Sequence, residues 1–296
     1  MRLAVFDVGG SYIKYACSTI SGTLSGKGKV ATPKQKESFH EMIRTILQSM
    51  GEVDGLAFSL PGFIDSERGY ISLGGSLRYH DNCSFIEEMQ NLFHLPITIQ
   101  NDAKCAALAE VWKGCGSNYR NAVVLVFGTG VGGAFLQDGN VYMGSHFMTC
   151  EFSCMITGDL QKQGAEAVFG NQFSIPLLVQ RIAKRIGQND IDGESIFRLA
   201  EQGNAEILEE LQQFYHKLAV HIYNLQCCYD PDVFFIGGGI SQQNSFVLGI
   251  RKAAEAFVSQ LPFPLPIPEI HSMTHKADAN LLGAVYQFQL SQGVSE

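Results

Sequence analysis

An apolar strand that runs into a glycine turn and returns as a second strand occurs twice in this sequence, at residues 3–16 and 122–136. An internal similarity of this kind predicts two related lobes. A third apolar run, at residues 230–241, also ends in glycines. Because glycine leaves room for positive φ or for the close approach of a ligand, a bound phosphate is the first hypothesis for these turns. Simple strand-joining turns are the alternative.

The pattern around these turns alternates strands with helices, which predicts an α/β fold. Strands are expected at residues 3–8, 13–19, 53–60 and 95–100, a turn at 21–28, and helices near 39–50, 103–112, 205–228 and 277–288. The polar segment 113–121 contains two glycines and is interpreted as the connection between two domains.

The composition disfavours nucleic acids and membranes as partners. The 296 residues carry a net charge of −8, without the basic stripe that nucleic-acid binding requires. No apolar run reaches the length of a membrane span, and the stretch before Asp7 is too short for a signal-peptide core, so a cytoplasmic protein is expected. The eight cysteines are dispersed, which favours reduced thiols over disulfides. A small-molecule ligand fits best.

Two acidic positions lie where strands end. Asp7 could be a turn residue, but between phosphate-binding turns its carboxylate suits a magnesium ion, often through water. Asn101 and Asp102 stand where a strand meets a helix, and both are common helix N-caps. An aspartate at a strand's carboxyl end could instead act as a general base on a substrate hydroxyl. Spacing leaves both interpretations open.

The later glycine clusters have similar alternatives. The turn at 128–133, GTGVGG, offers unobstructed backbone N–H groups and the Thr129 hydroxyl, which together can form an anion nest. A glycine-rich hairpin is the other interpretation. The cluster 237–239 could give a flat surface for a purine ring, or it could be a plain strand-to-helix loop.

Five segments, taken in order, resemble the ROK family of bacterial sugar kinases and repressors, within the actin-like ATPase superfamily. They are DVGGSYIK (7–14), SLPGFIDSERG (59–69), NDAKCAALAE (101–110), FGTGVGGAFLQDG (127–139) and DPDVFFIGGGIS (230–241). The resemblance implies two ribonuclease-H-like lobes with ATP and sugar in a cleft between them, and a homodimer. It places a sugar-side lobe at residues 1–117, on which the C-terminal helix at about 280–296 can pack back, and a nucleotide-side lobe at 118–279.

The resemblance also implies roles for individual residues. Asp7 matches a magnesium-associated aspartate, and Asp102 matches the catalytic base. Asn101, Gly62 and Glu151 are implied on the sugar side, with Asp102. Phosphate contacts are implied for Gly9, Gly10, Ser11, Gly128, Thr129, Gly130, Gly132 and Gly133, and adenosine contacts for Gly237, Gly238 and Gly239.

One segment departs from the family pattern. Where Gly-Glu-x-Gly-His and a zinc loop are usual, residues 150–155 read CEFSCM. Glu151 remains available for sugar hydroxyls, while Cys154 takes the histidine position, and His146 is a candidate replacement. No zinc site is expected, because the ligand set is incomplete. His271 and His275 would share a face if residues 271–275 were helical, but two histidines make only half a metal site, so surface or packing roles are expected.

These features together predict ATP- and Mg²⁺-dependent phosphorylation of a hexose or hexoside, at the 6-hydroxyl as in the family. Glucokinase, N-acetylmannosamine kinase and β-glucoside kinase activities all fit, and the sugar stays open. A repressor is disfavoured, because only six residues precede Asp7 and the chain is acidic. A catalytically inactive sugar-binding or sensor protein is the remaining alternative.

Overall fold

The computed structural model describes residues 1–294 and divides into two compact units. The first contains Met1–Ser117, Met143–Thr149 and the chain from Asp278 onward. The second contains Asn118–Tyr142 and Cys150–Ala277. Within the described residues, no helix has the length and apolar character needed to cross a membrane.

The first unit is built on a five-stranded sheet with the order β3-β2-β1-β4-β8. Its strands are β1 (Arg2–Val8), β2 (Tyr12–Thr19), β3 (Leu24–Ala31), β4 (Gly55–Leu60) and β8 (Ile97–Asn101). The first three strands form an antiparallel meander, whereas β4 and β8 run parallel to β1. A small sheet joins β5 (Phe63–Asp65), β6 (Tyr70–Leu73) and β7 (Cys83–Ser84).

The turn predicted at residues 21–28 is wrong over most of its length, because β3 begins at Leu24 and pairs with β2. Strand β3 is an edge strand in which no residue is buried. Glycine, serine and lysine therefore occupy positions that a half-buried strand would fill with apolar side chains. The sequence of β3 thus lacks the alternation that would have indicated a strand.

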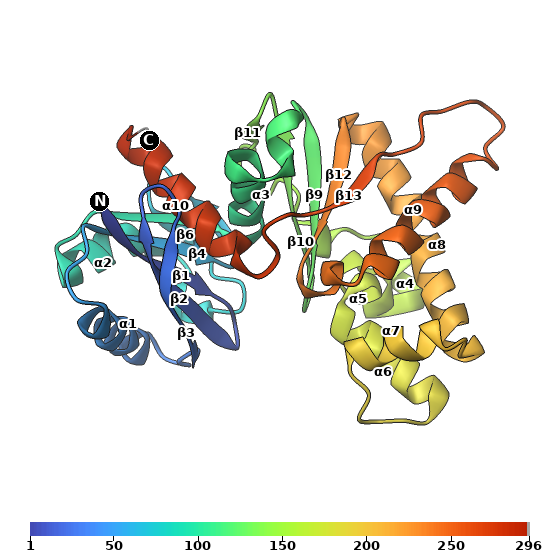
Figure 1. Cartoon of the computed structure of the whole chain (residues 1–296), viewed down its shortest axis with the longest axis horizontal. Coiled ribbons are helices and arrows are strands. Elements are labelled where there is room, and N and C mark those ends of the chain that lie inside the picture. The colour runs from blue at the N-terminus through green and yellow to red at the C-terminus, as the bar shows by residue number, and fades with distance from the viewer. Residues whose placement is uncertain (295–296) are drawn as a thin grey trace. The chain divides into compact units, whose positions relative to one another are not determined.

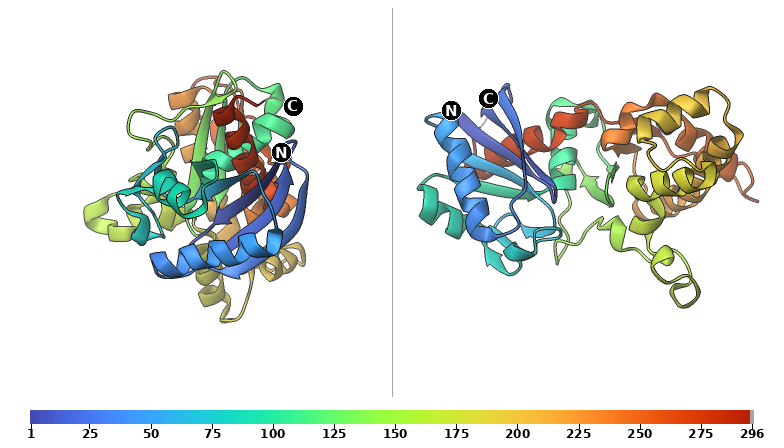
Figure 2. Two further views of the ribbon diagram at one scale, coloured as in Figure 1. Left: turned by 90° about the vertical axis from the view of Figure 1, so that its left-hand side faces the viewer. Right: turned by 90° about the horizontal axis from the view of Figure 1, so that it is seen from below.

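Helices cover both faces of this sheet (Figures 1 and 2). They are α1 (Lys36–Met50) and α2 (Phe85–Phe93) on one face, and α3 (Asp102–Lys113) and α10 (Ala279–Gln292) on the other. Alternate residues of β1 serve the two faces: Phe6 packs with the first pair, and Val5 packs with the second. Gly283 lets α10 approach α3 closely, since a Cβ there would lie 1.8 Å from the Cys105 carbonyl oxygen.

The second unit has a sheet of the same design, with the order β11-β10-β9-β12-β13. Its strands are β9 (Ala122–Phe127), β10 (Val131–Gln137), β11 (Asn140–Val141), β12 (Val233–Gly237) and β13 (Ile270–Ser272). Again the first three are antiparallel, and the last two are parallel to the first. The strand–turn–strand units predicted at 3–16 and 122–136 are confirmed as hairpins at the same place in the two sheets.

Helices of the second unit enclose its core. They are α4 (Leu160–Gln163), α5 (Phe169–Phe173), α6 (Ile175–Ile186), α7 (Gly193–Glu201), α8 (Ala205–Tyr229) and α9 (Asn244–Val258). Helix α8 begins with Asn204, whose side chain accepts a hydrogen bond from the Ile207 N–H. Its apolar stripe packs with α5, α6, α9 and the sheet. The predicted helix at 205–228 is confirmed, but His271 lies in β13, so His271 and His275 share no helical face.

Candidate active site

Asp7, at the carboxyl end of β1, is buried among polar partners. Its Oδ1 accepts hydrogen bonds from Ser59 Oγ at 3.2 Å and from Asn280 Nδ2 at 2.9 Å. Its Oδ2 pairs with Lys14 Nζ at 3.3 Å. The sequence analysis missed these three partners. Ser59 was visible as a polar residue in an apolar run, but Asn280 is 273 positions away and gave no signal.

Asn101 ends β8 and forms the N-cap of α3, as one of the two interpretations predicted. Its Oδ1 accepts hydrogen bonds from the N–H groups of Ala103 at 3.0 Å and Lys104 at 3.2 Å. Its Nδ2 donates to the Gly62 carbonyl oxygen at 3.0 Å. The cap uses both acceptor positions of the amide oxygen, so one N–H of Asn101 is the donor left for a ligand.

Asp102 is the first residue of α3 and is half-buried. Its Oδ1 accepts a hydrogen bond from the Ala103 N–H at 2.8 Å. Burial, and secondly the negative charge of Asp7, raise the pKa of the Asp102 carboxyl to about 6. A carboxylate with this pKa is a stronger base than an ordinary aspartate while staying ionised at neutral pH, which suits a general base.

The parallel strands explain why these residues lie together. Register pairs Asp7 on β1 with Ser59 on β4, and Leu60 on β4 with Asn101 on β8. The carboxyl ends of parallel strands form one edge of a sheet, which is where open α/β folds bind ligands. The structure therefore brings Asp7, Asn101 and Asp102 to the same edge.

The loop that contains Gly62 is bonded to Asn101 at this edge of the sheet. Gly62 has φ +106°, and a Cβ there would lie 1.9 Å from the Leu73 carbonyl oxygen and 2.9 Å from the Gly75 nitrogen. This glycine is therefore required by the packing of the β5–β6 region. Through its carbonyl bond to Asn101, it links that region to the start of α3.

The predicted phosphate turn of the first unit, Gly9–Ser11, joins β1 to β2. The Gly9 N–H donates to the Tyr12 carbonyl oxygen at 2.9 Å, and Thr32 Oγ1 donates to the Gly9 carbonyl oxygen at 2.7 Å. A Cβ on Gly10 would lie 2.8 Å from Ser76. Gly10 also borders a pocket of about 200 Å³, which is lined in addition by Pro33, Lys34, Ser76, Leu77, Arg78 and Tyr79. Two of these side chains are cationic.

In the second unit, Gly128–Gly130 form the turn between β9 and β10. Gly128 and Thr129 are exposed, and a Cβ on Gly128 would meet nothing within 4 Å. By contrast, a Cβ on Gly133 would lie 2.2 Å from the ring of Phe152, so packing alone explains that glycine. Gly132 lies within β10. Of the predicted anion-nest residues, the turn itself is the part open to a ligand.

The cluster at 237–239 lies beside that turn. Gly237 ends β12 and pairs with Val126 on β9. Gly238 has φ +88°, and a Cβ there would lie 2.0 Å from the Phe127 carbonyl oxygen. Gly239 is exposed, and a Cβ there would meet nothing within 4 Å. The second unit thus brings its two predicted nucleotide-binding clusters to one edge of its sheet.

Segment 150–155, which departs from the family pattern, belongs to the second unit and is hydrogen-bonded to β10. The Val131 N–H donates to Ser153 Oγ at 2.7 Å. Glu151 is half-buried, Cys150 is buried, and Cys154 is exposed. Among residues 1–294, no group of three or more His, Cys, Asp or Glu side chains could hold a metal ion. Whether His146 or Cys154 takes the role of the family histidine stays a prediction.

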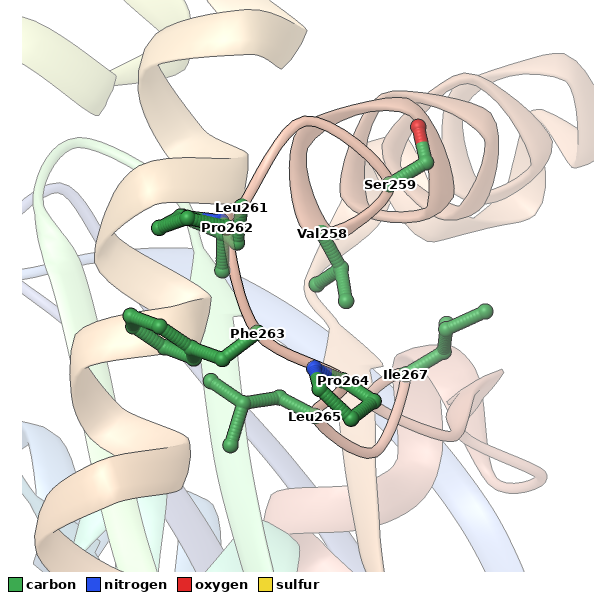
Figure 3. A pocket seen from close by; sticks show the side chains of 8 residues that line it. All are labelled: Val258, Ser259, Leu261, Pro262, Phe263, Pro264, Leu265 and Ile267. Carbon is green, nitrogen blue, oxygen red and sulfur yellow. The ribbon is translucent and has the colours of Figure 1, made fainter.

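A larger pocket, of about 340 Å³, lies in the second unit between α9 and β13 (Figure 3). Its lining comes from residues 258–267, with Phe263 and Ile267 more than half exposed. All the predicted site residues fall inside the described range 1–294, and none of them lines this pocket. It is therefore separate from the candidate active site.

The chain is similar over nearly its whole length to sugar kinases and to a ROK family protein of known structure. A β-glucoside kinase of Listeria monocytogenes is 31% identical over 97% of each chain. A β-glucoside kinase of Klebsiella pneumoniae is 30% identical over 97% of this chain and 96% of its own. The crystal structure of a ROK family protein from Streptococcus pneumoniae in complex with sucrose is 31% identical, with a TM-score of 0.88 over 99% of each chain.

These relatives confirm the predicted α/β fold, that of the actin-like ATPase superfamily. The predictions of a homodimer and a cytoplasmic location stay predictions. The family model described as ROK matches residues 3–290. The chain belongs to the ROK family.

Proposed function

We propose that this chain transfers the γ-phosphoryl group of ATP to a β-glucoside, with the 6-hydroxyl as acceptor. The activity class predicted from the sequence, a sugar kinase, is confirmed by its relatives, and the inactive-sensor alternative is not favoured. The β-glucoside is the finer step. It is supported by two relatives of that name at 30–31% identity.

The single observation that carries the mechanism is the environment of Asp102. With a pKa of about 6, its carboxyl is roughly nine-tenths ionised at pH 7 and can accept the proton of the attacking hydroxyl. The first turn of α3 holds the carboxylate in place through the Ala103 N–H. The hydroxyl oxygen attacks the γ-phosphorus while the bond to the ADP oxygen breaks, and the proton passes to Asp102.

Sugar recognition is proposed for Asn101 and Glu151. Asn101 offers its remaining N–H to a sugar hydroxyl, because its other amide positions are occupied by the helix cap and Gly62. Glu151, which is half-buried, would accept hydrogen bonds from sugar hydroxyls.

Nucleotide recognition is proposed for the glycine turns. The turn at 128–130 would offer the N–H groups of Thr129 and Gly130 to phosphate oxygens, because the Gly128 N–H already donates to the Gly130 carbonyl oxygen. Gly239 would offer exposed backbone to the adenosine. Gly10 and Ser11 of the first unit would contribute further N–H groups, whereas the Gly9 N–H is already bonded to the Tyr12 carbonyl oxygen. Residues 118–279 would thus form the nucleotide side, and residues 1–117 the sugar side.

Magnesium fits the residues at Asp7. Mg²⁺ usually keeps several waters and is bound by one or two carboxylates plus substrate phosphates, so a single aspartate at a strand end suffices. Asp7 would hold the ion that arrives with ATP, and the ion would neutralise phosphate charge. Lys14, which pairs with Asp7, adds a second positive charge there.

The test is sugar-dependent release of ADP by the full chain across a panel of sugars. Cellobiose and methyl β-glucoside should give the highest kcat/KM, above methyl α-glucoside, glucose and N-acetylmannosamine. Phosphorus NMR of the product should place the phosphate on the 6-oxygen. ATP turnover that does not depend on any sugar would overturn the kinase proposal, and a preference for glucose would overturn the β-glucoside assignment alone.

A further inference from the structure

Lys104 is a buried charge that the proposed mechanism does not use. The residue has no exposed surface and is among the largest fully buried side chains of the described chain. Burying an ammonium group is costly unless hydrogen bonds compensate for the lost water. Lys104 Nζ donates to the Phe147 carbonyl oxygen at 3.1 Å. Lys104 lies two residues after Asp102, so this hydrogen bond joins the first turn of α3 to Phe147.

The partner of Lys104 belongs to an unusual segment. Residues 143–149 belong to the first unit, although the chain on both sides of them belongs to the second. Gln100 Nε2 lies 3.8 Å from Met143 Sδ, so the segment is attached to the β8–α3 region at two points. Gln100 and Lys104 lie on either side of Asn101 and Asp102 in the sequence. The segment is therefore bonded to one residue two positions before Asp102 and to another two positions after it.

The backbone of segment 143–149 has positive φ angles at two positions. Phe147 has φ +59°, which a bulky side chain rarely adopts. Gly144 has φ +71°, and a Cβ there would lie 2.2 Å from Thr149 Oγ1. A backbone held in such conformations persists only where surrounding contacts enforce it. The hydrogen bond from Lys104 to the strained Phe147 residue is one such contact.

We propose that Lys104 is a positioning residue for the kinase reaction, which anchors segment 143–149 beside Asp102 and so restricts the chain that delivers Glu151. Glu151 follows Thr149 by two residues, which is at most about 7 Å of extended chain. The inference rests on the proposed function, because it assigns Glu151 to the sugar. The positive charge of Lys104 also favours the ionised form of Asp102.

The main test compares Lys104→Met with Lys104→Arg. Met keeps the length of the side chain and removes the donor, whereas Arg keeps a charged donor. In Lys104→Met, amide hydrogen exchange should become faster over residues 143–149. The KM for the sugar should rise about 10- to 100-fold, the range expected for losing a hydrogen bond to a charged group, with a smaller change in kcat. Lys104→Arg should recover most of both losses.

Lys113→Met is the matched control. Lys113 lies at the other end of α3, and its Nζ donates to the Ser21 carbonyl oxygen. This variant removes a lysine from the same helix without touching segment 143–149. Exchange in the segment and the sugar KM should stay as in the wild type.

Gly144→Ala tests the segment without altering Lys104 or Asp102. Its Cβ would collide with Thr149, so the sugar KM should rise while the KM for ATP stays constant. If Lys104→Met does not fold, this variant and Lys104→Arg decide the question. Unchanged exchange and sugar KM in Lys104→Met, or an unchanged sugar KM in Gly144→Ala, would overturn the proposal.

The exchange measurement separates this inference from the proposed function, because it needs no substrate. A wild-type chain that releases no ADP with any sugar would overturn the kinase function, and with it the kinase role of Lys104. Faster exchange in Lys104→Met would then still establish the anchor. An active kinase in which Lys104→Met behaves as the wild type would overturn the role of Lys104 alone.

Discussion

The two five-stranded sheets share one strand order, yet their carboxyl edges carry different chemistry. In the first unit, β1 ends with Asp7 and β8 leads into Asp102, so the edge is acidic. In the second unit, residues 122–133 contain no acidic side chain, and the edge offers glycine backbone. The same topology would therefore carry the proposed proton acceptor in one unit and the proposed anion-binding turn in the other. In open α/β sheets the topology sets the place of the ligand site, at the carboxyl ends of the strands. The side chains at those ends set the chemistry of the site.

The glycines of the two hairpins also differ. A Cβ on Gly10, in the first unit, would collide with Ser76, whereas a Cβ on Gly128, in the second, would meet nothing. Packing is a sufficient reason for Gly10. It gives no reason for Gly128, where the proposed phosphate contact would supply one.

The largest effect is expected from removing the base of the acidic edge. Asp102→Asn should lower kcat by about 10²- to 10⁴-fold, the usual contribution of a general base. The asparagine oxygen can still accept the Ala103 N–H, so thermal stability and ATP binding should stay constant. Steady-state kinetics and thermal unfolding measure the two properties. Glu67→Gln, at an exposed carboxylate of the same unit, is the control, and near-wild-type turnover in Asp102→Asn would refute the assignment.

Lowering the pH should reduce the activity of the unmutated protein through the same residue, Asp102. The pKa of Asp102 lies at about 6, so protonation removes the base as the pH falls through that value. Between pH 7 and pH 5 the ionised fraction drops about tenfold, and kcat/KM should drop by the same factor. Rates measured with saturating ATP from pH 4.5 to 8 test this. A profile that stays flat down to pH 4.5 would exclude Asp102 as the base.

A smaller effect, on ATP alone, is expected at the open glycine turn of the second unit. Gly128→Ala adds a methyl group where the protein leaves space, so stability should be unchanged. If phosphate passes there, the KM for ATP should rise about 10-fold, the cost of roughly one hydrogen bond. The sugar KM should not change. Gly193→Ala, at a second open glycine of this unit, is the control. An ATP KM equal to that of the wild type would remove Gly128 from the nucleotide site.

The central strands of both sheets and the positions of their ends could be predicted from the sequence, for a physical reason. Buried strands such as β4 and β9 are continuous apolar runs, and their ends are marked by Pro61 and Gly128. At Asn101 the predicted helix cap is confirmed, and one N–H is left over for the proposed sugar contact. Spacing could not separate these roles, since a cap and a ligand contact use different atoms of one amide.

Other features had no local signal. Strand β3 is an exposed edge without alternation, and Asn280 reaches Asp7 only because α10 packs on the first sheet. Lys104 is completely buried, although a lysine within a helix gives no sign of burial in the sequence. These contacts join distant segments, and a pattern within one segment does not contain them.

The smallest effect on activity is expected at His80, in the core of the first unit. His80 is buried among Phe39, Tyr79 and Phe85, and burial lowers its pKa to about 4. The unfolded chain therefore binds a proton near pH 6.5 that the folded chain refuses, so stability is full above that pH and is lost as the pH falls toward 4. Between pH 7 and pH 5 this single group should cost about 2 kcal/mol of unfolding free energy. His221 in the second unit is only half-buried, and burial also lowers its pKa.

His80→Phe removes the titrating group from the first unit and keeps an aromatic ring in the cluster. Activity at pH 7 should stay as in the wild type, since His80 is not among the proposed site residues. Urea unfolding at pH 7 and pH 5 should show a pH-dependent loss of stability that is about 2 kcal/mol smaller in the variant. A variant that loses as much stability in acid as the wild type would mean that the acid sensitivity arises elsewhere, and the second unit, with His221, would be the next place to look.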